Sequence, residues 1–357
     1  MDEHKAHSRR MMEALQWVAP GSPLREGIDN VLRANTGGLI VLGFDESMKA
    51  LVDGGFYIDT VFTPSYLYEL AKMDGAIILN REGTKIIYAN AHLNPDASLV
   101  STETGMRHRT AERVAKQTGA LVIAISQRRN VITLYQGNFR YAVKGIEVIL
   151  TKANQAINTL EKYKIVHDQA MANLAALEFE ELVTINDLLQ VLNRVAMVLR
   201  VKNELLIYLS ELGTEGRLIQ LQMNELLSDI EEEALHVLRD YSPEGALKPY
   251  EQLGKLQNLV HQEFLEEHVL LRLLGYQTTT HSEEIVHPRG YRVLMRIPRL
   301  PIMIIENVVD HFGTFPAIYK ASVAELDDVE GVGEARARKI IEGIRQVREQ
   351  TFADRHL

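Results

Sequence analysis

The chain has 357 residues, of which 46% are hydrophobic and 24% are charged, and its formal net charge is −9. This length predicts two or three domains, and the composition is typical of a soluble globular protein. The absence of cysteine excludes disulfides, thiolate catalysis and cysteine-bound zinc, and it favours a reducing cytoplasm. The negative charge excludes a uniformly basic surface, so any nucleic-acid site must be a local cluster of Lys and Arg. We expect no membrane span, because no apolar run reaches about 18 residues, and no signal peptide, because the first residues lack an apolar stretch.

Strand and helix patterns alternate over the first 145 residues. Apolar side chains at helical spacing predict helices over 4–18 and 23–33, and Thr63-Pro64 predicts the start of another helix. Short apolar runs predict strands, and the hairpin turns between some of them imply antiparallel pairs. The predicted strands are 39–42, 76–79, 85–88, 120–125 and 131–135, and a further helix over 106–118 ends at Gly119. We therefore expect an α/β domain with a mixed sheet.

The middle of the chain is expected to be all-α. From Thr151 onward apolar residues recur at helical spacing, and no proline lies between Pro95 and Pro243. Acidic residues such as Glu231-Glu232-Glu233 predict a solvated face on a helical bundle or spine, without a catalytic constellation.

The last region begins where proline returns, at Pro288. Four arginines follow without an intervening acid, and short helices are predicted over 301–345. These changes in pattern predict three domains, namely 1–145 (α/β), 146–287 (helical spine) and 288–357 (all-α). The four arginines are Arg289, Arg292, Arg296 and Arg299.

Apolar spacing around Gly331-Val332-Gly333 is typical of a helix-hairpin-helix. The glycines allow backbone amides at the start of the next helix to face a DNA phosphate, and Val332 fills the space between the two helices. Such contacts hold a DNA backbone without reading base sequence, and the neighbouring acids predict modest, salt-sensitive binding. Ile302 to Gly313 looks like a degenerate partner half, and the alternative interpretation is a compact oligomerisation domain. The predicted DNA-binding residues are Gly331, Val332, Gly333, Arg336, Arg338 and Lys339.

Thr104 to Thr110 opens a predicted helix with glycine, two arginines and a histidine. A helix N-terminus presents unpaired N–H groups and the positive end of the helix dipole, so basic residues there are unfavourable unless an anion binds. The segment therefore predicts a triphosphate site, although no P-loop pattern occurs. The alternative is a solvated arginine pair at a helix start.

Asp74-Gly75-Ala76 is the second candidate segment. Its carboxylate is suited to bind Mg²⁺ or Mn²⁺ and to polarise a ribose hydroxyl, and Gly75 leaves room for a nucleotide. The alternative is an ordinary Asp-Gly turn capped by its own carboxylate.

The two segments together resemble the DGA and RHR motifs of the diadenylate cyclase domain. Asp74-Gly75-Ala76 precedes Arg107-His108-Arg109-Thr110 by about thirty residues. The order of cyclase domain, helical spine and helix-hairpin-helix is similar over essentially the whole chain to the DNA integrity scanning family.

The resemblance implies an enzyme that condenses two ATP into cyclic di-AMP and two pyrophosphates. Each ribose 3′-hydroxyl attacks the α-phosphate of the facing ATP, with Asp74 as the ligand of Mg²⁺ or Mn²⁺. Asp74, Arg107, His108 and Arg109 form the implied catalytic set. The implied ATP-binding residues are Gly75, Ala76, Leu93, Thr104, Gly105, Met106, Arg107, His108, Arg109, Thr110 and Arg128.

The chemistry also demands a second chain. Each chain carries one ATP site, so condensing two ATP requires at least a face-to-face dimer, and the resemblance implies an octamer. It further implies binding of branched DNA that is coupled to cyclase activity, and a cytoplasmic, nucleoid-associated role in a DNA-damage and sporulation checkpoint.

Two other functions fit parts of the pattern. One is a non-catalytic DNA-binding scaffold that senses ATP. The other is a helix-hairpin-helix repair nuclease or glycosylase, against which no acidic cluster or catalytic lysine stands out beside the hairpin.

Overall fold

The computed structural model describes residues 2–243, 248–259 and 266–354. The chain divides into two compact units: Met1–Gln155 with Leu205–Leu221, and Ala156–Glu204 with Gln222–Leu357. Each unit is described by itself.

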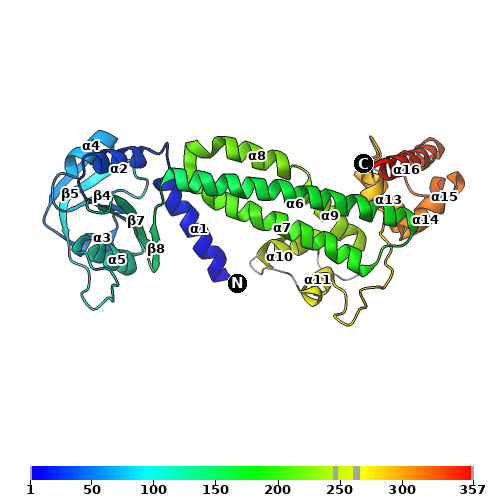
Figure 1. Ribbon diagram of the computed structural model, residues 1–357, viewed down its shortest axis with the longest axis horizontal. Coiled ribbons are helices and arrows are strands. Elements are labelled where there is room, and N and C mark those ends of the chain that lie inside the picture. Colours follow the sequence, from blue (N-terminus) through cyan, green and yellow to red (C-terminus); the bar gives the residue numbers. More distant parts are fainter. Residues whose placement is uncertain (1, 244–247, 260–265, 355–357) are drawn as a thin grey trace. The chain divides into compact units, whose positions relative to one another are not determined.

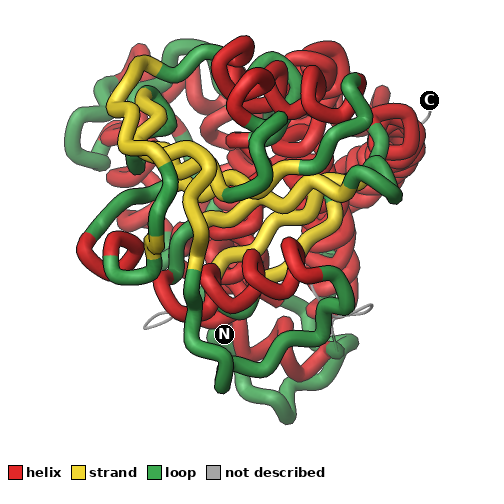
Figure 2. Tube along the Cα trace, turned by 90° about the vertical axis from the view of Figure 1, so that its left-hand side faces the viewer, coloured by secondary structure: helices red, strands yellow, loops and turns green. Residues whose placement is uncertain are grey.

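The first unit contains an eight-stranded mixed sheet, shown in Figure 2. The strands follow the order β2-β5-β4-β1-β6-β7-β8, and β3 pairs with β5. Only β1 and β4 pair in parallel, and the other pairs are antiparallel. The strands are β1 Gly38–Leu42, β2 Val52–Asp53, β3 Phe56–Val61, β4 Ala76–Leu79, β5 Lys85–Leu93, β6 Leu121–Ser126, β7 Val131–Gln136 and β8 Phe139–Ala142.

Helices cover both faces of this sheet, as Figure 1 shows for α2 and α4 on one side and α3 and α5 on the other. Successive side chains of a strand point to opposite faces, so Ile40 and Leu42 join one apolar cluster while Leu39 and Val41 join the other. The helices of this region are α1 Asp2–Trp17, α2 Pro23–Arg33, α3 Glu46–Lys49, α4 Pro64–Leu70 and α5 Met106–Thr118. The predicted α/β domain with a mixed sheet is confirmed.

Short-range sequence signals correctly predicted where α4 begins and where α5 ends. The Thr63 hydroxyl accepts a hydrogen bond from the Tyr66 N–H at the start of α4, and Gly119 ends α5 at a left-handed φ of 72°. The sequence analysis missed β2, β3 and β8. Most of β3 is exposed, so its residues do not form the apolar run by which buried strands are recognised.

The remaining helices begin with a pair of long ones. Helices α6 and α7 each run through both units, and α6 begins a little before the predicted Thr151. In the second unit, α6, α7, α9, α10 and α11 enclose one apolar core. The helices are α6 Ile146–Glu180, α7 Ile185–Leu212, the 3₁₀ turn Gly213–Gly216, α8 Arg217–Leu227, α9 Ile230–Tyr241, α10 Pro249–Leu259, α11 Glu267–Leu274, α12 Tyr291–Met295, α13 Ile302–Phe312, α14 Phe315–Lys320, α15 Val323–Asp327 and α16 Glu334–Asp354.

Charged groups buried in the second unit join its spine helices to α12. The Arg292 guanidinium lies 2.8 Å from Glu178 of α6, whose side chain is buried, while that of Arg292 is 11% exposed. The Asp240 carboxylate of α9 accepts hydrogen bonds from the N–H groups of Gly290, Tyr291 and Arg292 at 2.7–3.0 Å. Arg292 therefore packs inside the unit, although in the sequence it is one of four arginines that mark the start of the last region.

Two similar hairpins form the C-terminal module. The apolar residues in and after α12 have the same spacing as those in and after α15. Leu294 corresponds to Leu326, Ile297 to Val329 and Leu300 to Val332. Arg299 (φ 59°) and Gly331 (φ 78°) both have left-handed backbones. The predicted partner half therefore begins earlier than Ile302, because α12 supplies its first helix.

Within the described residues, no helix combines the length and apolar character needed to cross a membrane.

Candidate nucleotide and DNA sites

A cavity of about 690 Å³ lies at the edge of the sheet where β5, β6 and β8 end and where β1, β4 and β7 begin. Arg109 does not line it, and its Nε donates to the Glu103 carbonyl at 3.3 Å instead. The predicted residues that line the cavity are Asp74, Gly75, Ala76, Leu93, Thr104, Gly105, Met106, Arg107, His108, Thr110 and Arg128.

The turn before β4 holds Asp74 at the mouth of this cavity. Gly75 has a φ of 148°, and a side-chain carbon on it would lie 2.7 Å from the Asn90 carbonyl carbon. Only glycine fits this close approach without a backbone shift. The Asp74 side chain is 99% exposed, and its Oδ1 lies 3.5 Å from Nη2 of Arg107. The two segments singled out in the sequence therefore meet.

A glycine just before β1 makes room for Arg107. A side-chain carbon on Gly37 would overlap the Arg107 guanidinium. Gly37 is not among the site residues predicted from the sequence. Its role depends on contact with a residue that is distant in sequence, and no local signal reveals that contact.

The N-terminus of α5 is open to an anion. Its N-cap is Gly105, which offers no side-chain hydrogen bond, and the first turn holds no acid. The first amides of the helix and the dipole therefore act together with Arg107 and His108 on the cavity. Arg128 and Arg129, from the turn between β6 and β7, line the same cavity.

A hydrogen-bond chain fixes the imidazole of His108. The Tyr135 hydroxyl donates to Glu103 Oε1 at 2.8 Å, so its oxygen accepts from Nδ1–H of His108 at 3.0 Å. Arg140 pairs with the same Glu103 oxygen at 2.6 Å. The Nε2 atom of a neutral His108 therefore carries a lone pair, and it donates a hydrogen bond only after protonation.

The cavity holds His108 neutral when no anion is bound. Burial lowers the pKa of His108, and the guanidinium groups of Arg107, Arg140 and Arg129 lower it further, while Glu103 opposes them. The pKa of Glu103 is itself lowered, because hydrogen bonds from Arg140 and Tyr135 outweigh its burial. The sequence analysis missed Glu103, Tyr135 and Arg140, because nothing local marks them.

The second hairpin places the predicted DNA-binding residues at one end of α16. Gly331 and Gly333 are exposed, whereas Val332 is buried between the helices. The Arg336 guanidinium donates to the Gly331 carbonyl at 2.6 Å, so this arginine also closes its own hairpin. Arg338 pairs with Glu334, and both side chains are largely exposed, as is that of Lys339.

Three segments of the chain match known families. Residues 25–139 match the DisA bacterial checkpoint controller nucleotide-binding family, and residues 143–283 match the DisA bacterial checkpoint controller linker region. Residues 294–346 match the SAM-like helix-hairpin-helix tandem family, which agrees with the two hairpins described above.

Full-length relatives agree with these matches. The DNA integrity scanning protein DisA of Bacillus cereus and that of Bacillus anthracis are each 59% identical over 356 residues, which is 100% of both chains. A solved hypothetical membrane spanning protein from Bacillus cereus is 22% identical, over 34% of this chain and 62% of its own, with a TM-score of 0.31. DacA from Staphylococcus aureus is 20% identical, over 42% of this chain and 93% of its own, with a TM-score of 0.28. The last two similarities are too weak to support an argument.

The fold, the cavity and these matches define a nucleotidyltransferase of the diadenylate cyclase class that carries a helix-hairpin-helix module. The chain belongs to the DisA family of DNA integrity scanning proteins, because it is 59% identical to family members over its whole length. The resemblance stated from the motifs is confirmed, whereas the roles of individual site residues and the predicted domain boundaries stay predictions.

Proposed function

We propose that this chain condenses two ATP molecules into cyclic di-AMP and releases two pyrophosphates. The observation that carries this proposal is the convergence of Asp74 and the start of α5 on one cavity. Arg107, the amides of α5 and Arg128 bind the triphosphate and neutralise its charge. Each 3′-oxygen forms a bond to the α-phosphorus of the facing ATP, and the bond between its α- and β-phosphates breaks. Catalysis then comes from positioning and charge neutralisation.

The residues at Asp74 fit a divalent cation. Its carboxylate is exposed, and among the described residues its one ion pair is that of Oδ1 with Arg107, so carboxylate oxygens would be available to hold an ion. Such an ion supplies charge neutralisation at the phosphates and lowers the pKa of a bound hydroxyl. Asp74 holds Mg²⁺ or Mn²⁺ in this proposal and orients the attacking ribose.

Two chains must meet at this cavity. The described residues of one chain place a single Asp74 at this cavity, and the exposure of Asp74 leaves its carboxylate accessible to a second nucleotide. We therefore propose a face-to-face dimer as the smallest active assembly, within a larger homo-oligomer such as the octamer implied for the family.

The products identify the reaction. With all four nucleoside triphosphates and Mn²⁺ or Mg²⁺, the full chain is expected to yield cyclic di-AMP as the main product, with two pyrophosphates for each product molecule. Mass spectrometry and a pyrophosphate assay measure both quantities. ATP binding without pyrophosphate release would instead support an ATP-sensing scaffold, and guanine-containing products would contradict the proposed adenine selectivity.

His108 is expected to take up a proton when the triphosphate binds. Its pKa is lowered in the free protein, and a bound polyanion raises that pKa because it favours the imidazolium. Affinity for a non-reactive ATP analogue should therefore rise as pH falls from 8 to 6, by at most about tenfold per pH unit for one proton. Protonation of the γ-phosphate of the analogue changes the affinity of every variant in the same way. The difference in pH dependence between the parent chain and His108→Gln therefore measures the contribution of His108. Equal pH dependence in both proteins would contradict it.

We further propose that the tandem hairpins bind branched DNA and that this binding changes cyclase activity, which gives the enzyme a cytoplasmic role at the nucleoid. Two similar hairpins offer backbone amides and basic side chains to two DNA strands. A four-way junction is expected to change the rate of product formation, and a duplex of equal length should not. Lys339→Gln, which removes one exposed cation, should weaken junction binding and lower the dependence on salt by about one phosphate contact. Identical effects of junction and duplex on the rate would contradict the coupling.

A further inference from the structure

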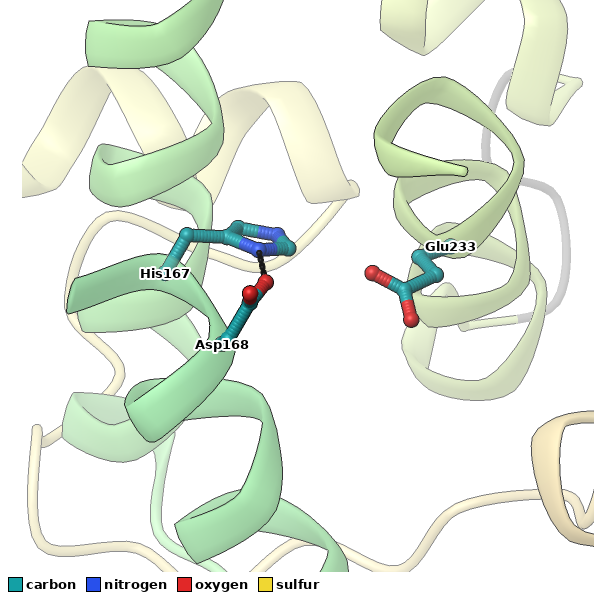
Figure 3. Close-up of side chains that lie close together, drawn as sticks. All are labelled: His167, Asp168 and Glu233. Atoms are coloured by element: carbon teal, nitrogen blue, oxygen red, sulfur yellow. Dashed lines mark hydrogen bonds and ion pairs between the residues drawn. The ribbon is translucent and has the colours of Figure 1, made fainter. Parts of the chain in front are cut away.

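Helices α6 and α9 bring three potential metal ligands together, away from the nucleotide cavity. His167 and Asp168 follow each other on α6, and Glu233 lies on α9. One ligand atom from each residue lies within 4.8 Å of the other two. Figure 3 shows the imidazole and the Glu233 carboxylate turned toward each other across the space between the two helices.

The imidazole of His167 is buried and has an unused ring nitrogen. Its side chain is 0% exposed, Nδ1 lies 3.2 Å from Asp168 Oδ1, and Nε2 has no hydrogen-bond partner among the described residues. A buried polar atom without a partner is unfavourable. Nδ1 of His167 and Oδ1 of Asp168 lie about as far apart as two neighbouring ligands of one ion, so a cation can take the place of the proton between them.

We propose that His167, Asp168 and Glu233 bind one divalent transition-metal ion. An imidazole combined with two carboxylates suits Zn²⁺ better than Mg²⁺, which prefers oxygen ligands and retains its water. Bonds of about 2.1 Å place neighbouring ligands of a tetrahedral ion about 3.4 Å apart, so the three side chains need only a small contraction. The ion joins α6 to α9 within the helical unit.

The surroundings of the cluster give an ion access and also set its affinity. Asp168 and Glu233 line a cavity of about 670 Å³, through which an ion reaches their carboxylates. Lys164 Nζ lies 2.9 Å from Asp168 Oδ2, so its ammonium group competes with a metal ion for this carboxylate. Replacing this lysine by a neutral residue should therefore strengthen metal binding, whereas neutralising Glu233 should weaken it.

The test is a titration of the full chain with Zn²⁺, and its outcome does not depend on cyclase activity. All variants carry Asp74→Asn, which removes the proposed cation ligand of the nucleotide site. The parent of this series should bind Zn²⁺ measurably by isothermal titration calorimetry and unfold at a higher temperature when Zn²⁺ is present. Glu233→Gln should lower the affinity about tenfold or more, and Lys164→Met should raise it a few-fold.

Glu232→Gln is the matched control, because it removes the same charge from the same cavity at a largely exposed side chain that is not one of the three clustered ligands. Its Zn²⁺ affinity should stay within about twofold of the parent. His167→Gln is a second loss variant, and circular dichroism checks that its core is intact. Absence of Zn²⁺ binding in the parent series, or equal affinities of Glu233→Gln and Glu232→Gln, would overturn the proposal.

Discussion

Asp74→Asn is expected to lower the rate of cyclic di-AMP formation by at least about a hundredfold while the fold remains intact. The carboxylate is the proposed cation ligand and orients the attacking 3′-hydroxyl, and a positioned group of this kind contributes about 10²–10⁴ to a rate. The side chain is 99% exposed and, in the part of the chain that the structure describes, its one ion pair is the long one with Arg107, so the change should alter stability by no more than about 0.5 kcal/mol. Pyrophosphate release measures the rate, and thermal unfolding measures the stability.

Asp59→Asn is the control for this experiment. Asp59 also lies on the sheet of the first unit, where it pairs with Lys85 at 3.1 Å, outside the residues that line the cavity. Its φ of 41° suits asparagine as well as aspartate. The control should keep the parent rate. Full activity of Asp74→Asn would refute the role of this carboxylate, and loss of activity in both variants would indicate a structural effect of either change.

In the first unit, the sequence predicts those features that neighbouring residues determine. Thr63 caps α4 with a residue three positions away, and Gly119 ends α5 by its own backbone conformation. Asp74 and the start of α5 were identified because each is a short motif with its own chemistry. Their meeting could be expected only from the family resemblance, because β-strand pairing and the approach of Arg107 past Gly37 depend on the whole sheet.

Contacts between distant residues explain what the sequence analysis missed. Arg292 is one of four arginines with no acid between them in the sequence, yet its partner Glu178 lies 114 residues earlier. The same holds for Glu103, which reaches Tyr135 and thereby His108 across the sheet edge. Charge patterns along a chain therefore indicate where a cation is, but the partner of that cation is decided by packing.

The buried pair of Arg292 and Glu178 should control the stability of the second unit. Arg292→Met leaves the Glu178 carboxylate in the core without its cation, and breaking a buried pair in this way costs about 3–5 kcal/mol. Burial already raises the pKa of Glu178, and loss of Arg292 raises it further. Because the folded protein then binds a proton more readily than the unfolded chain, the loss of stability should be larger at pH 8 than at pH 5.

The loss of the charge pair between Arg292 and Glu178 can be distinguished from a simple packing defect. The double variant Glu178→Gln/Arg292→Met removes both charges, so it should regain most of the stability lost in Arg292→Met and show little pH dependence. Urea unfolding followed by circular dichroism reports the helices, while the single tryptophan, Trp17, reports the apolar core of the first unit. The Trp17 transition should stay where it is in the parent chain. If the double variant is no more stable than Arg292→Met, removing the buried carboxylate has not restored the free energy of unfolding. The arginine would then stabilise the unit through its packing and not through its charge.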